Sequence, residues 1–326
     1  MAQEQLVQEV WALTKPKGEY RARRYHAALE EIVTFTPEER YLKPFLRKKS
    51  NGGYRVIRPA TRRLRIVQRA LAGWLRREFP RSADYCYNGL RIKAAVQVHR
   101  EARQALVVDL ANAFNYVTAG KLKSWLSFWL KRRGCFISEK VLDLIVDLMT
   151  YGGVTPQGCV STPYAFNLVF WPLDRCFLLI SEKRELEYTR YSDNMCFSSA
   201  EGEINFAELE ELVTLMVRGF GFLVSWSKRF DAEIVYLGLN IEDGEIGVVE
   251  EKLEEYREAL RAMMECPAPG VYYHEVLGIL AWLRQVYGKE IPEDLLDLLG
   301  EYFAQVGTPE SVSQLLAEKL QYQLWT

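Results

Sequence analysis

The sequence lacks the long apolar runs and paired cysteines that mark several classes of protein. No apolar run reaches the roughly 18 residues of a membrane-spanning helix, so no membrane partner is expected. The N-terminal segment carries acids and no basic stretch ahead of an apolar one, which argues against a secretory signal peptide. The six cysteines are scattered without a C-x-x-C pair. Reduced thiols in a cytoplasmic protein are therefore expected, and a zinc site is not.

The composition is that of a globular protein with a large core. Of the 326 residues, 49% are hydrophobic, which excludes a disordered chain. A chain of this length folds as one large domain or as two to three packed subdomains.

The net charge of −1 conceals a strong asymmetry along the chain. Residues 1–134 hold 28 lysines and arginines against 11 aspartates and glutamates, whereas residues 135–326 hold 14 against 32. A basic half suggests a polyanion such as nucleic acid as partner. A solvated basic face would have the same composition, so charge alone does not separate these two interpretations.

Hydrophobic periodicity predicts a mixed fold of helices and antiparallel strands. Helices are expected over 1–35, 62–79, 119–130, 138–150, 162–180 and 205–218, and the acidic segment 248–326 is mostly helical. In the helix over 162–180, Thr162 is the expected cap, Pro163 the first residue and Pro172 a site of kinking. Strands are expected at 104–110, in hairpins over 41–60 and 187–198, and as a small pair over 222–240.

Two acids stand at the ends of predicted strands. Asp109 follows the apolar strand residues 104–108, and Asp193 lies at the bend of the hairpin over 187–198. Either acid alone could simply cap a turn. Two acids at the ends of adjacent strands, however, can share a pair of Mg²⁺ ions, because magnesium prefers hard oxygen ligands and retains phosphate oxygens and water.

Six segments, taken in order, resemble the motifs of reverse transcriptases. They are KKSNGGYRVIRP (48–59) with LRIVQRAL (64–71) for the fingers, ALVVDLANAF (105–114) for motif A, TPQGCVSTPYAFN (155–167) for motif B, YSDN (191–194) for motif C, SWSKRF (225–230) for motif D and AEIVYLGLNI (232–241) for motif E. The resemblance implies an α+β right-handed polymerase fold with fingers, a palm built on an antiparallel sheet, and a helical thumb. N-terminal helices and fingers would occupy 1–103, the palm 104–244 and the thumb 245–326.

The resemblance also implies a role for each matched residue. Asp109, Asp193 and the carbonyl of Leu110 would ligate two Mg²⁺ ions, with Mn²⁺ as a possible substitute. Phe114 would exclude a ribose 2′-OH. The remaining roles concern the incoming dNTP, the template and the leaving group: Gln157 and Gly158 would contact the nucleotide, Lys48 and Arg55 would clamp its triphosphate, Lys228 would protonate pyrophosphate, and Arg62, Arg63, Arg65 and Arg69 would hold template phosphates. The expected activity is RNA-directed DNA polymerisation on an RNA template with a DNA primer or product.

Two features depart from the family pattern. Asn194 stands where motif C has a second aspartate, so a catalytically attenuated nucleic-acid-binding subunit is an open alternative. Residues 245–326 hold 6 bases against 15 acids, so either the bases Lys252, Arg257, Arg261, Arg284 and Lys289 line one face or the acidic face meets a protein partner.

Among reverse transcriptases, the chain most resembles the bacterial retron-type group, which implies a role in phage defence. His99, downstream of CYNGLRIKAAVQ, matches the histidine of a retron element. Leu-Gly-Leu-Asn at 237–240 stands where retrons usually read Val-Thr-Gly. Other bacterial defence-associated or CRISPR-associated reverse transcriptases therefore stay open.

Overall fold

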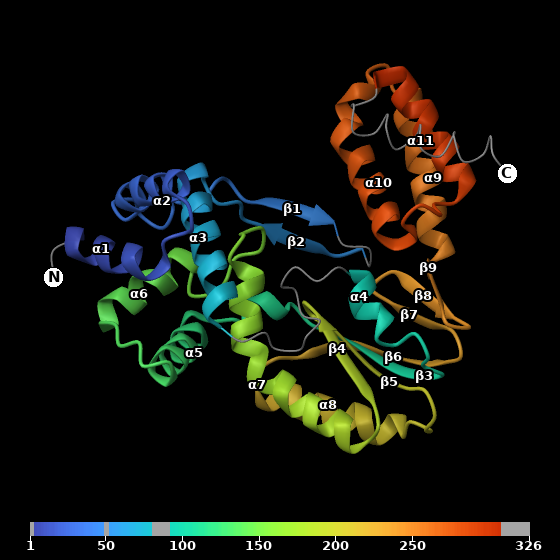
Figure 1. The fold of residues 1–326 in the computed structure, drawn as a ribbon, viewed down its shortest axis with the longest axis horizontal. Helices are drawn as coiled ribbons and strands as arrows, with labels where there is room; N and C mark the ends of the chain where they lie inside the picture. Colours follow the sequence, from blue (N-terminus) through green and yellow to red (C-terminus); the bar gives the residue numbers. More distant parts are fainter. Residues whose placement is uncertain (1–2, 49–51, 80–91, 308–326) are drawn as a thin grey trace. The chain divides into compact units, whose positions relative to one another are not determined.

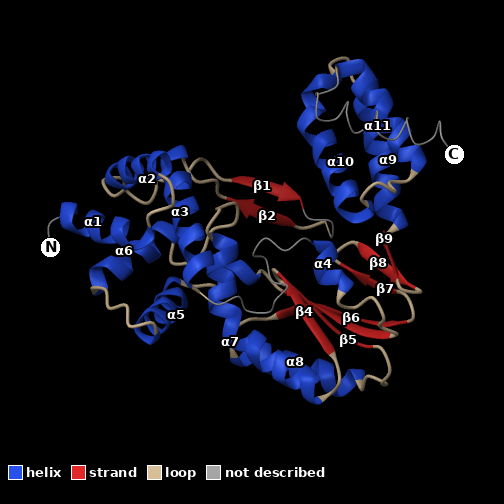
Figure 2. Cartoon of the chain, viewed as in Figure 1, coloured by secondary structure: helices blue, strands red, loops and turns tan. Residues whose placement is uncertain are grey.

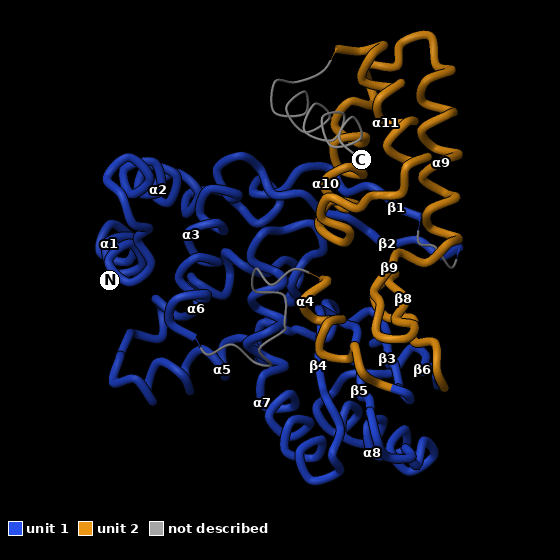
Figure 3. Tube along the Cα trace, turned by 45° about the vertical axis from the view of Figure 1, so that its right-hand side comes forward, with its two compact units in different colours: residues 1–90, 103–230 blue, residues 91–102, 231–326 orange. Residues whose placement is uncertain are grey.

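The computed structural model describes residues 3–48, 52–79 and 92–307. Residues 50 and 51 of the turn predicted at 50–53, Cys86 and the end of the predicted thumb lie outside these residues. The chain divides into two compact units, residues 1–90 with 103–230 and residues 91–102 with 231–326 (Figure 3). The expected division into fingers, palm and thumb is a functional one and stays a prediction.

The first unit begins with helices around a two-stranded ribbon. These elements are α1 (Gln3–Thr14), α2 (Glu19–Ile32), β1 (Phe45–Lys48), β2 (Tyr54–Ile57) and α3 (Arg62–Glu78). The Thr61 side chain accepts a hydrogen bond from the backbone N–H of Leu64, which caps the first turn of α3. One face of α3 is apolar and buried, and the helix contacts α2, α6 and α7.

Three further helices of this unit pack near the first ones: α5 (Ala119–Arg132), α6 (Glu139–Met149) and α7 (Thr162–Lys183). Thr118 and Ser138 cap α5 and α6 through their side chains. The predicted cap of α7 was wrong by one residue, because Ser161 precedes the helix and the Thr162 hydroxyl donates to the carbonyl of Pro156 at 2.7 Å.

A four-stranded antiparallel sheet forms the other half of the first unit (Figure 2). Its strands are β4 (Glu187–Tyr191), β5 (Asn194–Ser199), β3 (Gln104–Leu110) and β6 (Val224–Asp231), in that order across the sheet. The helix α8 (Phe206–Gly219) follows β5 in the chain. Residues 105–108 of β3 are all buried, as the continuous apolar run predicted.

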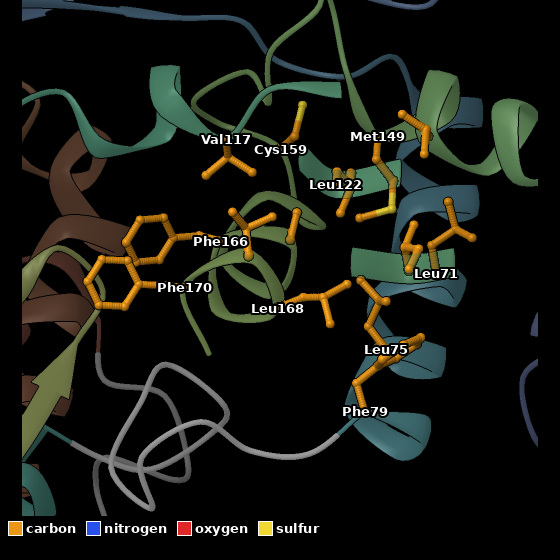
Figure 4. Close-up of a cluster of buried hydrophobic side chains, with 14 of the residues drawn as sticks. Leu71, Leu75, Phe79, Val117, Leu122, Met149, Cys159, Phe166, Leu168 and Phe170 are labelled. Atoms are coloured by element: carbon orange, nitrogen blue, oxygen red, sulfur yellow. The ribbon is translucent and has the colours of Figure 1, made fainter. Parts of the chain in front are cut away.

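The helix α7 links the helices to the sheet, because its side chains pack on both sides. Leu168 points toward Leu75 of α3 (Figure 4), whereas Phe166 and Phe170 lie on another side of α7. The ring of Phe170 lies 5.2 Å from the ring of Phe222, which leads into β6. One hydrophobic core therefore runs from the N-terminal helices to the sheet.

Where the structure describes it, the second unit contains a short helix, a three-stranded sheet and three longer helices (Figure 1). Its elements are α4 (Ile92–Gln97), β7 (Ile234–Tyr236), β8 (Leu239–Glu242), β9 (Glu245–Val248), α9 (Glu250–Glu265), α10 (Tyr273–Tyr287) and α11 (Glu293–Val306). The prediction of a single strand pair over 222–240 was wrong, because β6 joins the four-stranded sheet and β7 pairs with β8.

Candidate active site

The strands β3 and β5 bring the two predicted carboxylates together. The antiparallel register places Asp109 directly opposite Asn194, the residue that follows Asp193. The backbone N–H of Leu110 donates to the carbonyl of Asp193 at 3.0 Å. Directly opposed residues in such a ladder have Cβ atoms roughly 5 Å apart. The two acids therefore lie at the same end of the sheet, as the sequence predicted.

The turn that carries Asp193 is a tight hairpin. Tyr191 pairs with Asn194, so Ser192 and Asp193 are the two turn residues. Ser192 has a φ of 57°, in the left-handed region that two-residue hairpins require. The predicted hairpin is confirmed, with Asn194 in the strand β5 rather than at the bend.

Asn194 contributes an amide where a carboxylate would add a third negative charge. Its Nδ2 donates to Oδ1 of Asp193 at 3.4 Å. An ionised aspartate cannot donate and would repel Asp193 at that position. Asn194 thus lowers the negative charge of the site and contacts the neighbouring acid.

The donor set suits a hard divalent cation that also binds substrate. Asp109 and Asp193 supply carboxylate oxygens, while Mg²⁺ usually takes one or two carboxylates together with substrate phosphates and water. Among the described residues, no group of three or more His, Cys, Asp and Glu could hold a metal ion by itself. Two carboxylates are the donor set with which Mg²⁺ can also bind substrate phosphates.

Phe114 lies beside this end of β3 on a 3₁₀ turn, Ala113–Tyr116. Its ring is half-buried and lies 5.5 Å from the ring of Phe166 on α7. Its carbonyl accepts from the Thr155 hydroxyl at 3.0 Å. The Phe166 ring therefore packs beside that of Phe114, and the hydrogen bond from Thr155 fixes the Phe114 backbone.

Gln157 and Gly158 lie against the end of the strand β2. The carbonyl of Gln157 accepts a hydrogen bond from the N–H of Arg58 at 2.8 Å. Gly158 has a φ of +98°, and a Cβ there would lie 2.7 Å from Cγ2 of Ile57. Glycine is therefore required both by the positive φ and by the close approach of Ile57. These contacts fix the loop before α7 to the ribbon of β1 and β2.

The ribbon places the two proposed triphosphate ligands on different faces. Arg47 is paired with Arg55, and Lys48 is paired with Tyr54. Directly opposed residues share a face, and consecutive residues alternate between faces. Arg55 therefore shares a face with Arg47, and Lys48 lies on the other one.

Lys228 lies away from the carboxylates. The N–H of Ala111, just after β3, donates to the carbonyl of Leu223, just before β6. Since β6 begins beside the end of β3 and pairs with it, the strand runs back along β3. Lys228 lies five residues past Leu223, and its Nζ is 4.8 Å from the ring centre of Phe230.

The four arginines proposed to hold template have different surroundings on α3. Arg63 forms an ion pair with Glu31. Arg65 donates to the carbonyl of Ala60 at 3.2 Å. Arg62 and Arg69 are exposed, and Arg69 lines a groove between α2 and α3. The structure therefore does not gather all four into one patch.

A buried ion pair, which was not predicted from the sequence, supports the turn formed by Ser192 and Asp193. Arg190 on β4 and Asp174 on α7 are both fully buried and form two hydrogen bonds, at 2.8 and 2.7 Å. Nη1 of Arg190 also donates to Oδ1 of Asn167 at 3.1 Å and to the carbonyl of Ser192 at 2.8 Å. The signal was present, because a charged residue within an apolar helix needs a partner.

The bases of the C-terminal segment mostly form ion pairs with nearby acids. These pairs are Lys252–Glu255, Arg257 with Glu250, Glu254 and Asp294, and Arg261–Glu254. The Glu250 and Asp294 side chains raise the pKa of the Arg257 guanidinium. Arg284 and Lys289 lie together around the end of α10. The helix α9 therefore does not present three uncompensated bases to a nucleic acid.

Residues 46–241 match the family described as "Reverse transcriptase (RNA-dependent DNA polymerase)". The match covers more than half of the chain, and the chain belongs to this family. It is 25% identical over 183 residues to the Retron Ec83 reverse transcriptase of Escherichia coli, covering 53% of this chain and 57% of that protein. It is 26% identical over 175 residues to the Retron Mx65 reverse transcriptase of Myxococcus xanthus, covering 49% of this chain and 40% of that protein.

These relatives confirm the resemblance to bacterial retron-type enzymes. The chain spans about half the length of the curated relatives it matches. Solved structures confirm the polymerase fold. Apo telomerase from Candida tropicalis has a TM-score of 0.50 at 9% identity, covering 92% of this chain and 66% of that chain. A chain of an RdRp complex has a TM-score of 0.51 at 14% identity, covering 93% of this chain and 30% of that chain.

Proposed function

We propose that this protein is an RNA-directed DNA polymerase that adds dNTPs to a primer 3′ end on an RNA template. The observation that carries the proposal is the position of Asp109 and Asp193 at one end of the sheet, where Asp109 is opposite Asn194 and the N–H of Leu110 bonds to the carbonyl of Asp193. The family match extends over all the elements that build this end. Template-directed nucleotidyl transfer is the reaction that two such carboxylates serve in this family.

The protein contributes position and charge to an in-line phosphoryl transfer. Asp109, Asp193 and the carbonyl of Leu110 would hold two Mg²⁺ ions, or Mn²⁺ in their place. Such ions supply activation of the primer 3′-hydroxyl and charge neutralisation at the leaving pyrophosphate. Arg190 helps by fixing the carbonyl of Ser192, which keeps the turn under Asp193 in one conformation.

The nucleotide would lie between the ribbon and the loop before α7. Gln157 and Gly158 contact β2 through Arg58 and Ile57, so a shift of the ribbon would move the nucleotide contacts with it. Arg55, with Arg47 on the same face, would bind triphosphate oxygens, since guanidinium groups bind phosphate bidentately. Lys48 would act from the other face or near the turn. For Lys228, the proposed role of proton donor rests on the match to motif D alone, because the residue lies partway along β6, away from the carboxylates.

Primer extension tests the proposal. The protein is incubated with an RNA template, an annealed DNA primer, dNTPs and Mg²⁺. We expect extension, and we expect Asp109→Asn to lower its rate by roughly 10²–10³-fold, equivalent to several kcal/mol of transition-state stabilisation. If neither the protein nor its Asn194→Asp variant extends the primer, the proposal is wrong.

A catalytically attenuated RNA-binding subunit is the second candidate, and Asn194 is the observation that favours it. Under this alternative, the protein binds RNA but extends poorly, and Asn194→Asp restores extension without changing RNA affinity. Extension by the unaltered protein at a rate equal to that of Asn194→Asp would exclude attenuation.

We also propose a cellular role and a protein partner for this enzyme. Retron-type relatives suggest a cytoplasmic enzyme of bacterial phage defence. The acidic surface of α9 and α11 suggests a basic protein partner, because its few bases form ion pairs with neighbouring acids. Among the described residues, no helix is long and apolar enough to cross a membrane.

A further inference from the structure

A groove between α2 and α3 carries five basic side chains. The cavity has a volume of about 540 Å³. Its lining includes Lys17, Arg21, Arg24, Arg69 and Arg77, and none of the lining residues that the structure describes is an aspartate or glutamate. The helices α2 and α3 and the loop that precedes α2 supply all of these residues. Nothing in the proposed polymerase site accounts for the bases on α2.

These five bases have no acidic partner within the described part of the chain, whereas adjacent arginines do. Arg23, between two lining residues of α2, pairs with Glu19 at 2.5 Å, and Arg63 pairs with Glu31. In contrast, Arg24 lies over the Tyr20 ring, and Arg77 donates to the carbonyl of Lys15 at 3.5 Å. Like charges held close together repel one another, so the groove is a place where a bound anion would stabilise the fold.

The floor of the groove is kept open by small residues of α3. Ala70 and Gly73 both line it. A glycine inside a helix costs about 1 kcal/mol relative to alanine. Packing does not demand this glycine, since a Cβ at Gly73 would meet only Nη1 of Arg77, at an ordinary 3.6 Å. A larger residue would instead reduce the space between the two rows of bases.

The groove is separate from the carboxylates. The buried face of α3, which includes Leu71 and Leu75, packs against the core, and Gln68 on that face donates to the carbonyl of Leu148 on α6. Arg69 and Arg77 lie on the side of α3 that borders α2. No residue of β3, β5 or α7 lines the groove.

We propose that this groove is a second nucleic-acid site, which binds the phosphate backbone of RNA outside the polymerase site. Arginine binds phosphate bidentately, and several such contacts in a row follow a backbone. The one aromatic residue in the lining, Tyr25, is buried and its hydroxyl contacts Thr14 at 2.5 Å. Among the described lining residues, no exposed ring is therefore available to stack on a base, and binding is independent of sequence. The choice of RNA as ligand rests on the proposed function.

Fluorescence anisotropy with a labelled RNA hairpin, measured over a range of salt concentrations in EDTA and without dNTPs, tests this inference. We expect Arg21→Gln/Arg24→Gln to weaken binding at least about tenfold. The variant should also lower the slope of log K against log salt by about 2, since each lost phosphate contact removes about 0.9. The matched control is Arg23→Gln, on the same helix but paired with Glu19, and it should retain the slope.

A second variant fills the groove without changing its charge. Gly73→Leu replaces a poor helix former of α3 by a good one and should weaken RNA binding with no loss of thermal stability. Unchanged affinity and slope in the double variant, or an equal loss in Arg23→Gln, would overturn the inference. The inference would also be overturned if inorganic phosphate or free nucleotides competed as well as RNA does at the same concentration of phosphate groups.

The experiments distinguish failure of the inferred RNA site in the groove from failure of the proposed polymerase function. In one case, the protein does not extend primers, and its RNA binding is weakened by Arg21→Gln/Arg24→Gln but not by Arg23→Gln. This result contradicts the proposed polymerase function and supports RNA binding in the groove. In the other case, the protein extends primers, and the double variant binds the hairpin as tightly as the unaltered chain. This result supports the polymerase function and overturns RNA binding in the groove.

Discussion

Single residues at the candidate active site are held by backbone contacts as much as by side chains. The N–H of Leu110 bonds to the carbonyl of Asp193, and the register opposes Asp109 to Asn194. Sequence reasoning could predict both acids, because each ends or interrupts an apolar strand. It could not predict that the amide of Asn194 donates to Asp193, because that contact depends on the register.

Phe114 is expected to control the choice between deoxyribonucleotides and ribonucleotides. Its ring is held by Phe166, so it cannot easily move aside for a 2′-hydroxyl. Phe114→Ala should raise the incorporation of ribonucleotides relative to dNTPs by roughly 10- to 100-fold. Single-nucleotide extension with each substrate measures this ratio. Phe136→Ala removes an exposed ring and serves as control. Equal discrimination in both variants would remove Phe114 from the gate.

Gly158 is expected to be the least replaceable glycine of the candidate site. Alanine there would strain a φ of +98° and place its Cβ 2.7 Å from Ile57. Gly158→Ala should destabilise the protein by about 2–4 kcal/mol. The control Gly153→Ala has a φ of +80° and open space around the new Cβ, so it should cost only about 1–2 kcal/mol. Urea unfolding measures both, and equal losses would show that the contact with β2 is unimportant.

Elements were predicted more accurately from the sequence than the contacts between them. The strand β3 begins and ends as predicted, because an apolar run with an acid near its end has few alternatives. The segment 222–240 was assigned to one strand pair, although its strands belong to two sheets. Periodicity indicates that a segment is a strand, but strand pairing depends on the rest of the chain.

The strand β4 and the helix α7 are joined by the ion pair of Arg190 and Asp174. Both side chains are fully buried, and Tyr188 donates to the same carboxylate at 2.8 Å. Asp174→Ala would leave a buried cation without its partner and should cost about 3–5 kcal/mol in the free energy of unfolding. It should also reduce primer extension, because Arg190 holds the carbonyl of Ser192.

Urea unfolding measures the cost of Asp174→Ala, and an exposed pair provides the comparison. Arg184 and Glu208 form an ion pair at 2.5 Å, but both side chains are partly exposed to solvent. Glu208→Gln should therefore change the free energy of unfolding by less than about 1 kcal/mol. If both variants lose the same amount of stability, burial of the Arg190 pair does not matter to the fold.

At the scale of the whole molecule, the charge asymmetry of the sequence has a structural counterpart. Bases of α2 and α3 face a groove whose described lining holds no acid, whereas bases of α9 pair with acids of α9 and α11. The composition predicted a polyanion partner for the N-terminal half, but not the position of the groove. That position depends on which faces of two helices are brought together by packing.

The buried His99 should make the stability of the molecule depend on pH. Burial lowers the pKa of His99 from 6.5 to about 3, and its ring packs edge-on against Tyr236 in the second unit. Between these two values the folded protein keeps the imidazole neutral while the unfolded chain takes up a proton. The unfolded state then binds more protons, so the free energy of unfolding falls as the pH falls from about 6.5 towards 3.

The size of this effect follows from the linkage between protonation and folding. Midway between the two pKa values, His99 should lower the free energy of unfolding by about 1.4 kcal/mol for each unit by which the pH falls. His99→Gln removes the titrating group and should reduce the slope by that amount, even if it lowers stability at neutral pH. Urea unfolding of both proteins between pH 6 and 4 measures the difference, because the carboxylates that also titrate there are common to both. Parallel curves would mean that His99 takes up a proton in the folded state as readily as in the unfolded one.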